Sequence, residues 1–196
     1  MPFLLLQRSM SPMNSRSQTT ASYANFRLLA RNSALSSLTS QINVSINITD
    51  IDSDSMQAWK NTWLPNSMRQ PPNGGWNWEA IKSKYSRKPK HLSAAIWSNT
   101  ELCGLVVGDL NKTAVKIDAI EGSPVAHHPL RGLILAIGLE YAAKYAQASR
   151  LQEIWAIEPG EAIVGLYLRL GFAVGNAPDG RRICKRRLNH DELTKK

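Results

Sequence analysis

The sequence predicts one α/β domain in which a mixed sheet is flanked by helices, preceded by a flexible N-terminal segment. A chain of 196 residues with 43% hydrophobic residues is long enough for one such domain with its own core. A helical stretch at 133–145 separates two strand-like segments, as a right-handed crossover between neighbouring strands requires. We therefore divide the chain into a flexible or targeting segment (residues 1–40), the folded domain (41–188) and a C-terminal tail (189–196).

The first half of the domain is expected to hold three strands and two helices. Apolar and polar residues alternate from Ile42 to Thr49, which is typical of a half-buried strand. Prolines and glycines place a loop at residues 70–75, between two segments with an apolar helical face. The expected helices cover 53–63 and 76–85, and the expected strands cover 42–49, 91–97 and 102–110.

The second half repeats strand and helix in alternation. Its loop at 122–132 is rich in proline and glycine, which favours a turn before a helix. The expected strands are 114–120, 153–157 and a last strand that holds Cys184, and the expected helices are 133–145 and 162–172. Antiparallel strands followed by this alternation predict a sheet that mixes antiparallel and parallel pairs.

The N-terminal segment is rich in Ser, Thr, Asn and Arg and lacks the periodicity of a packed element. It carries Arg8, Arg16, Arg27 and Arg31, and no acidic residue precedes Asp50. We expect residues 1–40 to be mostly flexible. Organellar targeting is the alternative interpretation of this composition, whereas the default location is the cytoplasm.

Composition excludes several other classes. The apolar runs are interrupted by charge or glycine and fall short of the roughly 20 residues that a membrane span needs, so no membrane contact is expected. Cys103 and Cys184 lack disulfide or ligand spacing, and His127 and His128 have no further ligand nearby, so no metal is expected. The net charge of +9 is concentrated near the two ends, which favours a polyanionic partner such as nucleic acid, with solvated charge as the alternative.

The motif Ala162-Ile-Val-Gly-Leu-Tyr-Leu-Arg-Leu-Gly-Phe172 follows the strand at 153–157 and the helix at 133–145. This arrangement resembles the acyl-CoA-binding half of the GCN5-related N-acetyltransferases. The resemblance covers residues 46–185 in element order and 114–172 in motif. It implies the acyl-CoA N-acyltransferase fold with a splayed central sheet, and transfer of an acetyl group from acetyl-CoA to an amine by direct attack.

The same resemblance implies where acetyl-CoA would bind. The pantetheine arm would pair with the exposed backbone of Asp118, Ala119 and Ile120, and the diphosphate would lie against the turn that opens the next helix, Leu130, Arg131, Gly132, Leu133 and Ile134. In the family this turn reads Gln or Arg, two residues, Gly, one residue, then Gly or Ala. Aligned on Gly132, this chain has Pro129 and Ile134 at the other fixed positions. An ordinary buried strand and an ordinary helix-starting loop are the alternatives.

Catalytic residues also follow from the resemblance. Tyr167 matches the family's proton donor to the departing thiolate, and Glu121 matches the carboxylate that many members use as a base. Glu158, just past the strand at 153–157, is the second carboxylate of interest and is grouped with the acceptor site. A core tyrosine and solvated carboxylates at strand ends are the alternatives.

Four of the six tryptophans fall within the twenty residues 59–78, which contain parts of the two helices expected to border the acceptor. They are Trp59, Trp63, Trp76 and Trp78. An aromatic wall suits a flat or cationic acceptor, whereas packing of two short helices is the alternative.

Three functions remain in order of preference: an N-acetyltransferase, a non-catalytic binding or regulatory module of the same fold, and a nucleic-acid-associated basic protein. The acceptor could be a small-molecule amine, a peptide amine or an RNA-linked amine. The sequence does not fix the oligomeric state, and a homodimer is one option.

Overall fold

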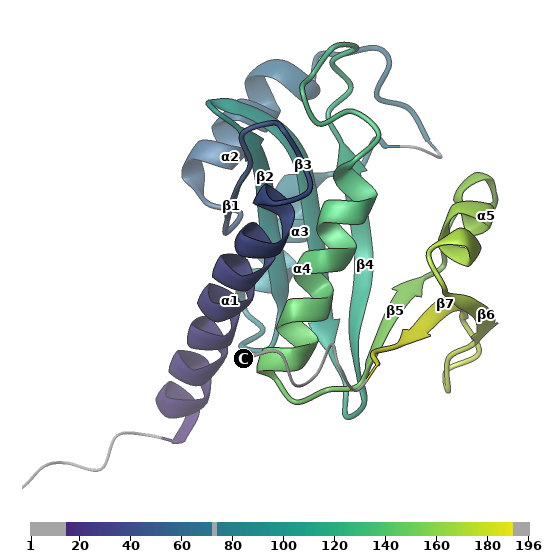
Figure 1. The fold of residues 1–196 in the computed structure, drawn as a ribbon. Coiled ribbons are helices and arrows are strands. Elements are labelled where there is room, and N and C mark those ends of the chain that lie inside the picture. Colours follow the sequence, from purple (N-terminus) through teal and green to yellow (C-terminus); the bar gives the residue numbers. More distant parts are fainter. Residues whose placement is uncertain (1–14, 72–73, 190–196) are drawn as a thin grey trace, which may run out of the picture.

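The computed structural model describes residues 15–71 and 74–189. They form a seven-stranded mixed sheet with helices on both faces (Figure 1). The strands are β1 (Asn47–Thr49), β2 (Leu92–Ser98), β3 (Glu101–Leu110), β4 (Ala114–Gly122), β5 (Glu153–Ile157), β6 (Ala173–Asn176) and β7 (Arg182–Arg187). Their order is β1-β2-β3-β4-β5-β7-β6, and β4–β5 is the parallel pair among antiparallel ones. The expected α/β class and mixed sheet are therefore confirmed.

The helices are α1 (Ser15–Thr39), α2 (Ser53–Ala58) with its π-helical continuation η1 (Trp59–Trp63), α3 (Trp78–Ser86), α4 (Ile134–Ala148) and α5 (Glu161–Arg169). Figure 1 shows α1 and α4 on one face of the sheet, called the front here, and α2 and α3 on the rear face. Helix α4 is the crossover between β4 and β5. Its buried side includes Ile137, Tyr141 and Tyr145, which pack on the front of the sheet.

Residues 15–39 form a helix that packs along α4, so the expectation of a flexible segment is wrong over this range. Its buried positions recur every four residues, at Ala30, Ala34 and Leu38. Small side chains allow α1 to approach α4 closely, and an ion pair of 2.8 Å joins Arg31 to Asp50 beyond the helix. Residues 1–14 lie outside the described part, and organellar targeting stays a prediction.

Two strands differ from the sequence prediction. Strand β1 is limited to Asn47–Thr49, because residues 42–46 pack on the core without pairing in the sheet. Strand β6 was not expected, and it pairs with β7 in register from Ala173↔Lys185. Strand β5 has the predicted bounds.

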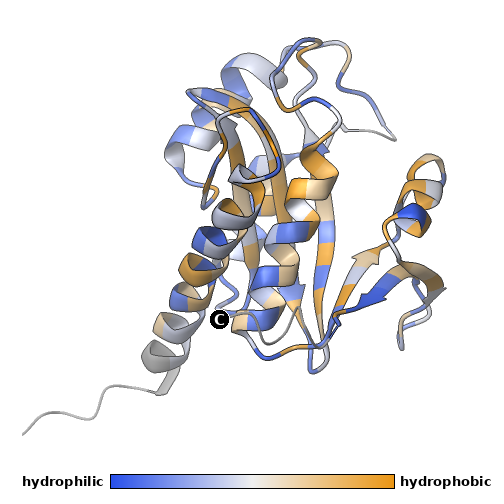
Figure 2. Cartoon of the chain, in the orientation of Figure 1, coloured by the Kyte–Doolittle hydropathy of each residue, from blue (hydrophilic) through white to orange (hydrophobic). Residues whose placement is uncertain are grey.

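The core lies on both faces of the sheet, and its larger part is on the front. Figure 2 shows apolar colour recurring along β2 to β5 and on α4 and α5, with polar residues between. None of the described helices is both long enough and apolar enough to span a membrane.

Candidate active site between β4 and β5

Strands β4 and β5 pair over only part of their length. Their register runs from Ala114↔Glu153 to Ile117↔Ala156 and stops there. Beyond this point, residues 119–122 of β4 pair with β3 on the other side. The backbone groups of residues 118–122 that face β5 are therefore free of sheet partners, and the expected divergence of these strands is present.

A β-bulge marks the point of divergence. Val107 lies opposite Ala119 and Gly108 lies opposite Ile117, so Asp118 is the extra residue. A Cβ atom on Gly108 would lie 1.8 Å from the carbonyl oxygen of Lys116, so glycine is required at this position. Because a bulge bends its strand, this feature turns β4 away from β5.

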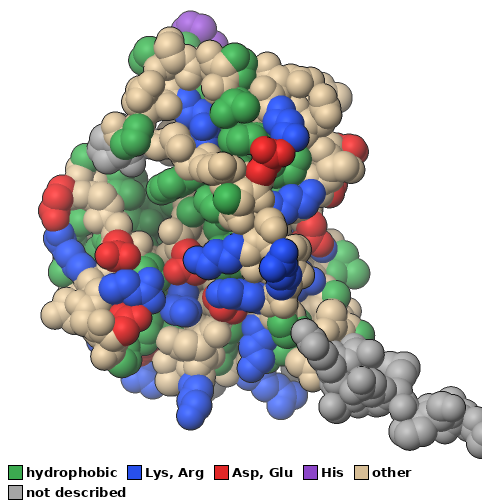
Figure 3. All heavy atoms as spheres, turned by 180° about the vertical axis from the view of Figure 1, so that it is seen from behind, with side chains coloured by type: hydrophobic (Ala, Val, Ile, Leu, Met, Phe, Trp, Pro, Cys, Tyr) green, Lys and Arg blue, Asp and Glu red, His purple; other side chains and the backbone are tan. Residues whose placement is uncertain are grey.

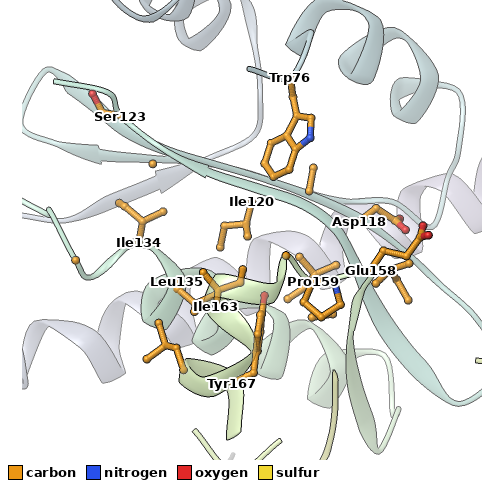
Figure 4. A pocket seen from close by; sticks show the side chains of 18 of the residues that line it. Trp76, Asp118, Ile120, Ser123, Ile134, Leu135, Glu158, Pro159, Ile163 and Tyr167 are labelled. Atoms are coloured by element: carbon orange, nitrogen blue, oxygen red, sulfur yellow. The ribbon is translucent and has the colours of Figure 1, made fainter. Parts of the chain in front are cut away.

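The divergence opens into a cavity of about 420 Å³. Figure 3 shows a hollow with apolar side chains on the rear face of the molecule, and Figure 4 shows the cavity lining from close by. One wall is apolar and comes from β4, α4 and α5, through Ile120, Ile134, Leu135, Ile163 and Leu166. Polar groups in the lining come from Asp118, Ser123, His128, Arg131, Glu158 and Tyr167.

The N-terminus of α4 forms one end of the cavity. Leu133 is its N-cap and supplies no side-chain hydrogen bond, so the first backbone N–H groups of the helix lack a capping side chain. Gly132 has φ +80°, and no atom lies within 4 Å of the place where its Cβ would be. Arg131, Gly132 and Ile134 line the cavity, whereas Leu130 is buried in the core. Free N–H groups and a helix dipole make this end suited to a phosphate.

Tyr167 lies on α5 with its ring against Phe172, at a centroid distance of 5.2 Å. The residue is 2% exposed, yet it lines the cavity, and Figure 4 shows its hydroxyl pointing inward. Burial raises the pKa of Tyr167 to about 12, so the phenol keeps its proton at neutral pH.

Asp118 and Glu158 line the opposite end, and Figure 4 shows their side chains extending toward each other. The hydroxyl of Tyr85, on α3, donates a 2.7 Å hydrogen bond to Oδ2 of Asp118. Burial, followed by the hydrogen bond to Asp118, raises the pKa of Tyr85. Glu158 has φ +48° and is exposed at the end of β5.

Solved structures with the same architecture include several acetyltransferases. One is the PaiA N-acetyltransferase of Thermoplasma acidophilum in complex with coenzyme A, at 15% identity and a TM-score of 0.53, covering 74% of this chain and 99% of that one. The ribosomal-protein-S18-alanine N-acetyltransferase of Escherichia coli also matches at 15% identity and a TM-score of 0.53, covering 74% and 94%. An acetyltransferase of Salmonella typhimurium that modifies the N-terminal serine of ribosomal protein L7/L12 matches at 12% and 0.54, covering 74% and 96%.

The chain has the GCN5-related N-acetyltransferase fold. No protein-family model matches its sequence, and no curated protein does. At identities this low, the similarity establishes the fold and leaves the activity to be argued from the site.

Glu121 is placed differently from the base expected by analogy with this fold. Its side chain is 1% exposed and pairs with Arg69, with Nε to Oε1 at 2.7 Å. The backbone N–H of Gly75 and the indole N–H of Trp78 also donate to its carboxylate. Glu121 does not line the cavity, and both of its oxygens are occupied. Glu121 therefore ties Arg69, Gly75 and Trp78 to β4.

Of the four tryptophans expected to line the acceptor site, Trp76 lines the cavity between β4 and β5. Trp59, Trp63 and Trp78 are buried in the rear core, so the prediction that they line a binding site is wrong. The indole of Trp63 donates to the carbonyl of Leu102 at 3.2 Å, which fixes it against β3. Trp76 lines the cavity and meets the ring of Trp78 edge to face at 6.3 Å.

His128, in the loop before α4, adds a further polar group to the cavity. It is buried and lines the cavity, and its Nδ1 has no hydrogen-bond partner within the described residues. Burial lowers the pKa of His128, so the ring is neutral at neutral pH. In residues 15–71 and 74–189, no three His, Cys, Asp or Glu side chains form a group that could hold a metal ion.

Proposed function

We propose that the protein is an acyl-CoA-dependent N-acyltransferase that uses acetyl-CoA as donor. The observation that carries this proposal is the incomplete pairing of β4 and β5, which opens onto a cavity containing the hydroxyl of Tyr167. Neighbours of the same fold include an enzyme in complex with coenzyme A, which supports the choice of donor.

The donor would occupy the cavity along its length. Its pantetheine amides would bond to the unpaired edge of residues 118–122, as an added strand would. Its diphosphate would lie at the α4 N-terminus, where backbone N–H groups and Arg131 supply positive potential. The apolar wall formed with α5 would cover the aliphatic part of the arm.

This placement brings the thioester to the bulge in β4. Attack by a neutral amine on the carbonyl carbon puts negative charge on oxygen, which a backbone N–H near Ile120 would stabilise. The carbon–sulfur bond then breaks, and the departing thiolate receives a hydrogen bond and a proton from Tyr167. Because the pKa of Tyr167 is raised to about 12, activity should not fall through loss of this proton between neutral pH and about pH 10.

Calorimetry with acetyl-CoA, followed by turnover of Tyr167→Phe, tests the proposal. The variant should bind acetyl-CoA as the wild type does and lower kcat about 100-fold, because one acid is lost. Tyr23→Phe, on α1 away from the cavity, is the matched control and should keep the wild-type rate. Absence of acetyl-CoA binding by the wild type would end the proposal.

A further inference from the structure

Asp118 occupies a special place on β4. It is the extra residue of the bulge, immediately after the last β4–β5 pair. Its side chain lines the cavity beside Glu158, at the opposite end from Ile134 (Figure 4). An amine approaching a thioester at the bulge would meet this carboxylate first.

Contacts with α3 orient the carboxylate and leave one oxygen available. Tyr85 donates to Oδ2, and its own ring is fixed by burial and by the ammonium of Lys88, 4.7 Å from the ring centroid. Tyr85 is the one hydrogen-bond donor to the Asp118 side chain within the described residues, so Oδ1 remains open to a ligand.

Asp118 and Glu158 lie in a region where the basic side chains are engaged elsewhere. Neither forms an ion pair with Lys or Arg in the part of the chain that the structure describes. Arg181 interacts with both through space, but its guanidinium is held by Asp179, with contacts of 2.7 and 3.0 Å. Lys88, whose ammonium lies over the Tyr85 ring, pairs with Asp109 at 2.8 Å.

We propose that Asp118 accepts the proton of the incoming ammonium, that Tyr85 is its positioning residue, and that Glu158 attracts the positive charge to the entrance. This inference rests on the proposed acyltransferase function and names the acceptor class as a protonated primary amine. It replaces Glu121 as the base, because both oxygens of Glu121 are bonded outside the cavity.

The proton balance is complete with the groups present. One N–H proton of the ammonium passes to Oδ1 of Asp118 and then to solvent. The neutral amine forms the new carbon–nitrogen bond, and the carbon–sulfur bond breaks. The thiolate takes the proton of Tyr167, and the second N–H proton, released from nitrogen as the amide forms, restores the phenol.

Asp118→Asn tests the assignment with two kinds of amine. The charged probes are 1,4-diaminobutane and seryl-alanine amide, and the neutral probe is hydroxylamine. The charged probe that the wild type acetylates faster is the one used for the comparison. The variant should lose about 100-fold in kcat/KM with the charged probe and stay within about threefold with hydroxylamine. The loss should shrink as pH rises, because more of the charged amine is then already neutral.

Two further variants separate chemistry from structure. Tyr85→Phe should lower kcat with the charged probe about tenfold and show the same recovery with pH, because the carboxylate is present but less well oriented. Glu140→Gln, on α4, is the control and should match the wild type. Acetyl-CoA binding is measured for every variant and should match that of the wild type. Absence of binding by the wild type would refute the proposed function itself.

Equal losses of Asp118→Asn with charged and neutral amines, or losses that do not change with pH, would overturn the assignment. Acetyl-CoA binding without turnover of any of the three amines would overturn it as well.

Discussion

The two ends of β4 serve different purposes. Residues 115–117 pair with a strand on each side, whereas residues 119–122 pair with β3 alone, beside the cavity. The change occurs at one residue, where the bulge adds Asp118. One strand can thus be structural at one end and present free backbone groups at the other.

The same contrast separates two carboxylates on the open end. Glu121 points into the rear core and binds Arg69, Gly75 and Trp78. Asp118 lines the cavity, and Tyr85 is its one hydrogen-bond donor in the part of the chain that the structure describes. Burial with full hydrogen bonding favours a structural role, while an open oxygen in a cavity favours chemistry.

The largest expected effect is on protein stability, and it differs between substitutions of these two carboxylates. Glu121→Gln should lower the free energy of unfolding by about 3 kcal/mol, because it leaves the buried Arg69 charge unpaired. Asp118→Asn should cost about 1 kcal/mol or less, the value of one hydrogen bond. Urea unfolding measures both, and similar losses would refute the contrast between them.

The second expected effect concerns the stability of the β-bulge in β4. Gly108→Ala should destabilise the protein by about 3 kcal/mol, because the added methyl group overlaps the Lys116 carbonyl oxygen. Gly175→Ala is the control, because the nearest atom to its Cβ position is Cε of Lys185 at 3.8 Å, and it should change stability by less than about 0.5 kcal/mol. A Gly108→Ala variant as stable as the control would show that the bulge does not depend on glycine.

The smallest expected effect concerns binding at the two ends of β4. Arg131→Ala, at the cavity, should weaken acetyl-CoA binding about fivefold, which is about 1 kcal/mol, and reduce its dependence on salt. Lys112→Ala, in the turn before the closed end, should leave the Kd unchanged. Equal weakening by both variants would indicate a general charge effect in place of a phosphate site.

Local patterns predicted much of the fold. Strand β5 was predicted with its observed bounds, because its five residues are mostly apolar and Pro159 follows closely, which limits where the strand can end. The position of Tyr167 beside the cavity and the divergence of β4 and β5 came from the resemblance of the 162–172 motif. Spacing alone could not supply them, because strand divergence depends on contacts between distant segments.

The rest depends on tertiary contacts that leave little trace in the sequence. Helix α1 buries alanines every four residues, a stripe with too little hydrophobicity to reveal an amphipathic face. The partnership of Arg69 with Glu121 spans 52 positions and joins a loop to a strand. Trp59, Trp63 and Trp78 had the right residue type for a binding wall, but the depth of the rear core decided their role.

Backbone amide hydrogen exchange along β4, measured with and without acetyl-CoA, tests the central claim most directly. The account predicts that acetyl-CoA slows exchange of the amides in residues 118–122 that face the gap, while residues 115–117, already paired on both sides, change little. Unchanged exchange of residues 118–122 at saturating acetyl-CoA would contradict it.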